Sequence, residues 1–230
     1  MSRPEFDGFS GSYEDLLRDP IRDRFSGRES AFFHLRKRDL IREFFRGRRM
    51  DASRLHYLDA GCGKGELLNL LRDDFLRAAG CDVSAEMMRA IQTVETRVQK
   101  DPLTIPFPDA EFDFITAVCV YHHIPPSARP AFTAEICRTL KSGGIFCLIE
   151  HNPLNPVTRL IVGRAPVDAG AVLLGGAEAR RLAQAAGLTP IHRPYFLFFP
   201  QRLYRACGGI ERALGSLPLG GQYALFARKP

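Results

Sequence analysis

The chain has 230 residues, 45% of them hydrophobic and 25% charged, a balance typical of a globular protein and unlike that of a disordered chain or a disulfide-stapled miniprotein. Its length suits a single α/β domain with insertions. The six cysteines form no CxxC pair, mostly lie in apolar runs, and indicate neither disulfides nor a metal site. The net charge of +6 would permit a polyanionic partner, but most basic residues are interleaved with acidic ones.

The N-terminal residues carry acids and glycines where a signal peptide would have its apolar segment, and no stretch approaches the ~20 apolar residues that span a bilayer. We therefore expect a cytoplasmic protein. Apolar residues at helical spacing over 13–47 predict a helical lid, residues 1–54, that belongs to the same domain. The densest basic patch runs from Arg36 to Arg54. It is interpreted as a solvated helix face, with nucleic-acid binding as the alternative.

Strand and helix patterns alternate from residue 55 onward. Strands are expected at 55–58, 80–83, 112–120 and 145–150, with an extended segment around Val98. Helices are expected at 66–75, 84–91 and 127–140, the last ending in a turn at 141–144. This alternation predicts a doubly wound, mostly parallel, Rossmann-like α/β sheet with helices on both faces.

A glycine-rich turn, Gly61-Cys62-Gly63-Lys64-Gly65, separates the first strand from the first helix of this pattern. Such a turn lets backbone N–H groups approach a ligand at the carboxyl edge of the sheet. Its spacing differs from GxGxxG, and Lys64 is followed by glycine rather than by serine or threonine, so neither the dinucleotide fingerprint nor a phosphate loop is present.

The pattern breaks after Glu150, where Pro153 and Pro156 oppose a continued strand or helix. Residues 151–176 are interpreted as an insertion over the carboxyl ends of the strands, with helical order resuming only near residue 177. A strand at 191–199, a helix at 201–214 and a last strand at 222–228 complete a sheet of seven strands. The helix at 201–214 is amphipathic and basic. Packing against the sheet is the favoured interpretation, and a membrane surface or a lipid-linked acceptor is the alternative.

Four stretches resemble motifs of the class I S-adenosylmethionine (SAM)-dependent methyltransferases, of the type 11-like small-molecule family. LDAGCGKG (58–65) resembles the first motif, and GCDVSAEM (80–87), DPLTIPFPD (101–109) and LKSGG (140–144) resemble later motifs in the family's order. The resemblance covers about residues 55–150. It implies SAM as the cofactor, S-adenosyl-L-homocysteine as the product, and a methyltransferase domain over 55–230.

The resemblance also implies which residues bind the cofactor. The glycines would leave room for its amino-acid end and ribose, Asp59 would face its cationic part, Asp82 would accept from the ribose hydroxyls, and Asp101 from the adenine amine. Each of three residues has a structural role as the alternative to cofactor binding. Asp82 could cap a helix, Asp101 could stabilise a turn, and Met87 could pack in the core. Phe33 with Arg36 or Lys37 resembles an aromatic and basic pair over the SAM carboxylate, and a plain surface helix is the alternative. The expected cofactor-binding residues are Asp59, Gly61, Gly63, Gly65, Asp82, Val83, Met87, Asp101, Pro102, Leu103, Val118, Phe33 and Lys37.

The acceptor is expected at the carboxyl edge of the sheet, where Tyr121-His122-His123 and His151 each follow a strand. A histidine of near-neutral pKa suits removal of a proton from a hydroxyl acceptor, so His122, His123 and His151 are the catalytic candidates. A structural role is the alternative for the first two. Arg159 could bind an acidic group or pair with Glu150 or Asp168. The expected substrate-side residues are Tyr121, Asn152, Asn155 and Arg159.

Together these features predict a metal-free methyltransferase that acts on an oxygen or nitrogen of a small molecule, sugar-like or a secondary metabolite. Two alternatives stay open. One is an RNA or protein methyltransferase that uses the basic N-terminal face, which predicts salt-dependent affinity for polyanions. The other is a SAM-binding protein without turnover.

Overall fold

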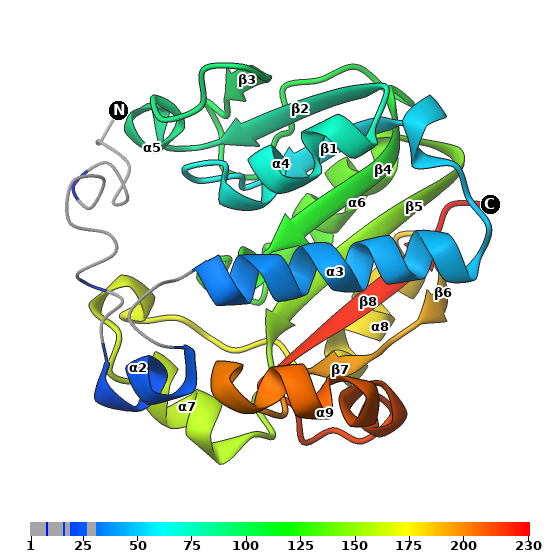
Figure 1. Ribbon diagram of the computed structural model, residues 1–230. Helices are drawn as coiled ribbons and strands as arrows, with labels where there is room; N and C mark the ends of the chain where they lie inside the picture. Colours follow the sequence, from blue (N-terminus) through cyan, green and yellow to red (C-terminus); the bar gives the residue numbers. More distant parts are fainter. Residues whose placement is uncertain (1–7, 9–15, 17–18, 27–30) are drawn as a thin grey trace.

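The structure is a computed structural model that describes residues 8, 16, 19–26 and 31–230 (Figure 1). Its eight-stranded sheet has the order β3-β2-β1-β4-β5-β8-β6, and β7 also pairs with β8. The pairs among β1 to β5 are parallel, whereas β8 runs antiparallel to β5, β6 and β7. The strands are β1 (His56–Ala60), β2 (Arg77–Asp82), β3 (Glu95–Val98), β4 (Phe112–Val118), β5 (Leu140–His151), β6 (Thr189–His192), β7 (Tyr195–Phe196) and β8 (Gln222–Arg228).

Helices cover both faces of the sheet, which confirms the predicted architecture. Figure 1 shows α3 crossing in front of the sheet, with α6 and α8 behind it. The α-helices are α2 (Pro20–Ser26), α3 (Ala31–Gly47), α4 (Glu66–Leu71), α5 (Ala85–Met88), α6 (Arg129–Thr139), α7 (Pro156–Val162), α8 (Gly176–Ala185) and α9 (Gln201–Leu214). Two short 3-10 turns, η4 (Tyr121–His123) and η5 (Pro166–Asp168), lie near the carboxyl edge of the sheet.

Two apolar cores lie on the two faces of the sheet. On one face Phe44 of α3 stacks on Phe226 of β8, with ring centroids 3.9 Å apart. On the other face Phe132 and Ile136 of α6 are fully buried in a separate cluster. Burial of one such side chain contributes about 1.5–3 kcal/mol. The central strands are therefore apolar on both faces, which explains their continuous hydrophobic runs.

Three expectations about secondary structure need correction. The predicted strand at 191–199 is divided into β6 and β7 before and after Arg193-Pro194, so the sheet has eight strands instead of seven. Residues 141–144 are not a helix turn but an irregular part of β5: Phe112 pairs with Leu140, and Phe114 already with Ile145. The predicted helix at 13–47 corresponds to α2 and α3 over its described part, and its residues 13–15, 17–18 and 27–30 lie outside the described part of the chain.

The insertion at 151–176 is more ordered than its prolines suggested. Pro156 occupies the first turn of α7, where its missing N–H is harmless. The side chain of Asn155 caps this helix by accepting from the N–H groups of Val157 and Thr158. The insertion thus places α7 and η5 beside the carboxyl ends of the parallel strands.

Candidate functional site

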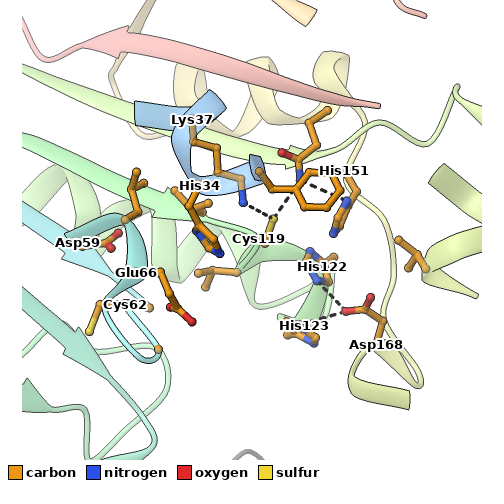
Figure 2. A pocket seen from close by; sticks show the side chains of 18 of the residues that line it. His34, Lys37, Asp59, Cys62, Glu66, Cys119, His122, His123, His151 and Asp168 are labelled. Carbon is orange, nitrogen blue, oxygen red and sulfur yellow. Dashed lines mark hydrogen bonds and ion pairs between the residues drawn. The ribbon is translucent and has the colours of Figure 1, made fainter. Parts of the chain in front are cut away.

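A large cavity of about 1200 Å³ lies at the carboxyl ends of β1, β2, β4 and β5. Side chains from α3 and from the insertion also line it, so that the first 50 residues and the segment after β5 both contribute to its wall (Figure 2). In parallel α/β sheets ligands bind at this edge. No helix within the described ranges is long and apolar enough to cross a membrane.

The glycine turn after β1 bends over the end of β2. Gly61 has φ +78°, and its N–H donates to the carbonyl oxygen of Cys81 at 2.8 Å. Gly63, with φ +52°, donates its N–H to Oδ2 of Asp82 at 2.8 Å. The other carboxylate oxygen of Asp82 accepts from the N–H of Ser84, the residue that caps α5. These bonds hold the turn in the left-handed backbone region that glycine adopts without strain.

Asp59 lies buried beneath this turn and faces the cavity. Its Oδ1 accepts a hydrogen bond of 2.6 Å from the hydroxyl of Thr116. Burial, with a smaller contribution from the nearby Asp82, outweighs the Thr116 bond that favours the carboxylate, and the pKa of Asp59 is raised to about 7. A cationic ligand group would favour the ionised form, so Asp59 suits the positive part of a bound molecule.

Lys37 and Cys119 meet at the wall of the cavity. Lys37 Nζ lies 3.8 Å from Cys119 Sγ, and the side-chain amide of Gln222 donates to the same sulfur at 3.5 Å. Burial raises the pKa of the thiol, but the positive charge of Lys37 and the neighbouring His151 outweigh it, and the pKa falls to about 7. Cys119 therefore differs from the inert apolar cysteine that the sequence indicated.

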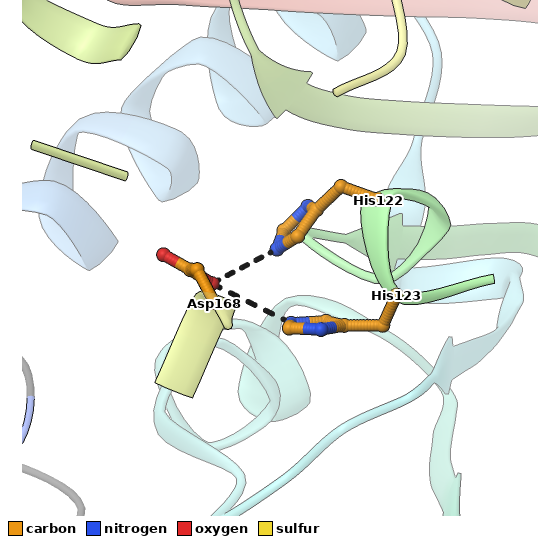
Figure 3. Close-up of side chains that lie close together, drawn as sticks. All are labelled: His122, His123 and Asp168. Atoms are coloured by element: carbon orange, nitrogen blue, oxygen red, sulfur yellow. Dashed lines mark ion pairs between the residues drawn. The ribbon is translucent and has the colours of Figure 1, made fainter. Parts of the chain in front are cut away.

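His122 lies between two carboxylates. Its Nδ1 is 2.7 Å from Glu150 Oε2, and its Nε2 is 3.3 Å from Asp168 Oδ1. His123 Nε2 lies 3.7 Å from the same oxygen of Asp168 (Figure 3). Burial lowers the pKa of His122, but Glu150 and Asp168 outweigh it and hold that pKa above its ordinary value. Burial, together with the charge of His122, lowers the pKa of His123 to about 4.

Most of the expected cofactor residues share this cavity, but three lie outside its lining. Gly65 faces Ile91 rather than the cavity. Asp101 accepts hydrogen bonds from the N–H of Leu103 and the hydroxyl of Thr104, as expected of a residue that stabilises a turn. Leu103 packs against the apolar core. Those that line the cavity are Asp59, Gly61, Gly63, Asp82, Val83, Met87, Pro102, Val118, Phe33 and Lys37.

All three catalytic candidates line the cavity, whereas the substrate-side residues mostly do not. Tyr121 is fully buried, with its hydroxyl bonded to Thr133. The side-chain amide of Asn152 donates to the carbonyl oxygens of Pro218 and Gly220, so it fixes the loop before β8. Asn155 reaches the cavity but serves as the cap of α7. Arg159 is exposed outside it.

Several groups that line or support the site were not identified from the sequence. Glu150 and Asp168 were considered as partners of Arg159, but both contact His122. Cys119 was grouped with the apolar cysteines, although its position directly after β4 could have indicated the sheet edge. His34 and Gln222 carried no motif, and only the packing of α3 and β8 brings them to the cavity.

The basic patch on α3 is largely matched by acids. Arg36 is buried, pairs with Glu211 of α9 at 2.8 Å, and lies over the ring of Tyr204. Of the alternatives Arg36 and Lys37, only Lys37 lines the cavity. Arg42 forms a paired contact with Asp74. The contacts of Arg36 join α9 to α3, and α9 also contacts β7 of the sheet.

Comparisons with known proteins agree with this geometry. Residues 58–148 match the family described as a methyltransferase domain. An uncharacterized methyltransferase of Synechocystis sp. is 32% identical over 102 residues, which are 43% of this chain and 48% of that protein. The chain thus spans about half the length of the curated relative it matches.

Solved structures share the fold over a larger part of the chain. A chain from the complex between the Haloferax volcanii Trm112 methyltransferase activator and a methyltransferase has 21% identity and a TM-score of 0.68, with 100% of both chains covered. Geranyl diphosphate C-methyltransferase from Streptomyces coelicolor, solved with Mg²⁺, geranyl diphosphate and S-adenosyl-L-homocysteine, has 19% identity and a TM-score of 0.59, covering 84% of this chain and 77% of that one. The motifs and the matched residues 58–148 support a SAM-dependent methyltransferase, and the solved structures show that the fold is shared.

Proposed function

We propose that this protein transfers a methyl group from SAM to an oxygen or nitrogen of a small-molecule acceptor. The observation that supports it is one continuous cavity that carries both kinds of group. Asp59, Gly63 and Asp82 line the part expected to hold SAM, and His122 and His151 line the part expected to hold the acceptor. Transfer from a sulfonium needs mainly proximity and orientation, which such a shared cavity would supply.

His151 is the histidine that best suits the removal of a proton from a protic acceptor. It lines the cavity beside Cys119, and its Nδ1 lies 3.4 Å from the Gln222 amide. The two nitrogens of His122 already face Glu150 and Asp168, so His122 suits positioning rather than proton transfer. A histidine in contact with the acceptor hydroxyl would take its proton as the methyl group transfers.

A small-molecule acceptor fits the described surface better than a polyanion. Three of the basic residues of α3 pair with acids: Arg36 with Glu211, Arg38 with Asp39, and Arg42 with Asp74. Such pairing reduces the positive potential that a nucleic acid would need. The cavity is also large enough for SAM together with a second molecule of modest size.

Calorimetric titration with SAM and with S-adenosyl-L-homocysteine tests the proposal. Wild-type protein should bind both, and Asp82→Ala should weaken binding by about 1–3 kcal/mol, the scale of a lost hydrogen bond to a charged group. Asp73→Ala is the matched control, because the side chain of Asp73 is 89% exposed. Folded wild-type protein that binds neither compound would contradict the proposal. Binding without methyl transfer in a broad acceptor screen would favour a SAM-binding protein that lacks turnover.

A further inference from the structure

Two imidazoles and one carboxylate converge at the wall of the cavity (Figure 3). One ligand-type atom each from His122, His123 and Asp168 lies within 4.8 Å of the others. Asp168 Oδ1 lies 3.3 Å from His122 Nε2 and 3.7 Å from His123 Nε2. Ligand atoms that share one tetrahedral zinc ion at about 2.1 Å lie about 3.4 Å apart. We propose that His122, His123 and Asp168 bind a divalent transition-metal ion whose remaining coordination positions face the cavity.

Glu150 orients the first of these ligands. Its Oε2 lies 2.7 Å from Nδ1 of His122, and its Oε1 accepts from the N–H of Tyr121 at 2.7 Å. Glu150 is itself fully buried, so this carboxylate has a fixed position. With the proton of the ring on Nδ1, the lone pair of Nε2 points toward Asp168. Histidine ligands of metal ions almost always donate their second nitrogen in this way.

Contacts outside the proposed site hold its two halves together. The guanidinium of Arg129, which is buried, donates to the carbonyl oxygens of Tyr121 and Ile124 at 3.1 Å and also to that of Val172. The N–H of Val172 in turn donates to the carbonyl oxygen of His122 at 2.9 Å. The segment with the histidines and the segment after Asp168 are therefore already joined. A preformed site loses little entropy when it binds an ion.

The ligand chemistry favours zinc or iron over magnesium or calcium. Two imidazoles with one carboxylate are the ligands of catalytic zinc sites and of non-haem iron sites, which keep positions open for water or substrate. Mg²⁺ and Ca²⁺ prefer oxygen ligands throughout. If the methyltransferase function proposed above holds, an acceptor oxygen bound to the ion would be more acidic beside the methyl donor.

The same distances also suit a metal-free arrangement in which a protonated His122 bridges Glu150 and Asp168. Metal titration of the full chain, without SAM, separates the two. Protein stripped with a chelator is titrated calorimetrically with Zn²⁺, and with Co²⁺ by visible absorption. We expect one ion per chain, and we expect Asp168→Asn and His123→Gln each to weaken binding by at least about 10–100-fold.

Two controls make the test specific. His192→Gln removes a histidine outside the cavity lining, and Cys119→Ser removes a thiol that could bind zinc independently. Both should keep the wild-type affinity. Circular dichroism confirms that each variant is folded.

Failure to bind about one ion, or binding unaffected by Asp168→Asn and His123→Gln, would overturn the proposal in favour of the ion-pair bridge. SAM titration of the chelator-treated protein keeps the two proposals apart. Loss of SAM binding bears only on the methyltransferase function, and loss of metal binding only on the metal site.

Discussion

The ammonium nitrogen of Lys37 on α3 lies 3.8 Å from the thiol sulfur of Cys119, directly after β4. This contact joins the N-terminal helix to the carboxyl edge of the sheet. It also places a cation beside a thiol, an arrangement that favours the thiolate. The reactivity of Cys119 thus depends on the position of α3 at the cavity.

Replacement of Lys37 should make Cys119 less reactive at neutral pH. Alkylation by iodoacetamide, followed by peptide mass spectrometry, should rise with pH through a midpoint near 7 in wild-type protein. In Lys37→Met the lost positive charge raises the pKa, so the midpoint moves to higher pH. Lys141→Met, which removes a lysine paired with Asp113 outside the cavity lining, should leave the profile unchanged. Identical profiles for Lys37→Met and wild type would contradict the contact.

Asp59 should make the protein less stable as the pH rises. An unperturbed aspartate has a pKa of 3.8, whereas the pKa of Asp59 in the folded protein is about 7. The folded state thus binds the proton more tightly, and its stability falls as the pH rises from about 4 to about 7. Asp59→Asn removes this penalty, which amounts to about 4 kcal/mol at most.

Urea unfolding at pH 5 and pH 8 measures this effect. The variant should gain stability over wild type mainly at pH 8, and it should bind SAM more weakly there because the attraction for a cationic group is lost. Asp73→Asn, at an exposed position, should show neither change. An equal effect of Asp59→Asn at both pH values would rule out the raised pKa.

Gly61 and Gly143 allow the effect of a close approach to be separated from that of backbone strain. Both have positive φ, +78° and +77°, but a Cβ on Gly61 would lie 2.4 Å from Val120 Cγ2, whereas none of the described atoms lies within 4 Å of a Cβ on Gly143. Gly143→Ala should cost about 1–2 kcal/mol for the left-handed backbone. Gly61→Ala should cost about 1–3 kcal/mol more for the overlap.

The double variant Gly61→Ala/Val120→Ala provides the control. It should recover part of the additional stability that Gly61→Ala loses, because the clashing methyl group of Val120 is gone. Thermal unfolding of the three variants measures the difference. Equal melting temperatures for Gly61→Ala and Gly143→Ala would show that Val120 moves aside freely.

The buried pair Arg36–Glu211 should be far more important for stability than the exposed pair beside it. Arg36 and Glu211 are 6% and 3% exposed, and Glu211 also accepts from the N–H of Phe198 at 2.9 Å. Removal of one partner leaves a buried charge, so Arg36→Met should cost about 3–5 kcal/mol. Arg38→Met, which breaks the pair with the 36% exposed Asp39, should cost less than about 1 kcal/mol.

Urea unfolding of Arg36→Met, Glu211→Gln and the double variant separates the pair from packing. The double variant should be more stable than the sum of the single losses predicts, since neither charge remains unpaired. Additive losses would mean that the two side chains act independently.

The sequence determined the architecture and the position of the cavity. Periods of apolar residues indicated strands and helices in the right order, and the glycine turn lies where predicted. Side chains that directly follow parallel strands must meet at one edge of the sheet, so the proximity of His122, His123 and His151 could be predicted without coordinates. The three line one cavity, as expected.

Only the tertiary structure decided which charged groups these histidines contact. Asp168 is distant in sequence and reaches His122 because the insertion folds back over the sheet edge. Neighbouring residues on α3 point in different directions, so Arg36 pairs with α9 while Lys37 reaches Cys119. Local periodicity specifies the face of a helix or strand on which a side chain lies, but the partner of a buried charge depends on long-range packing.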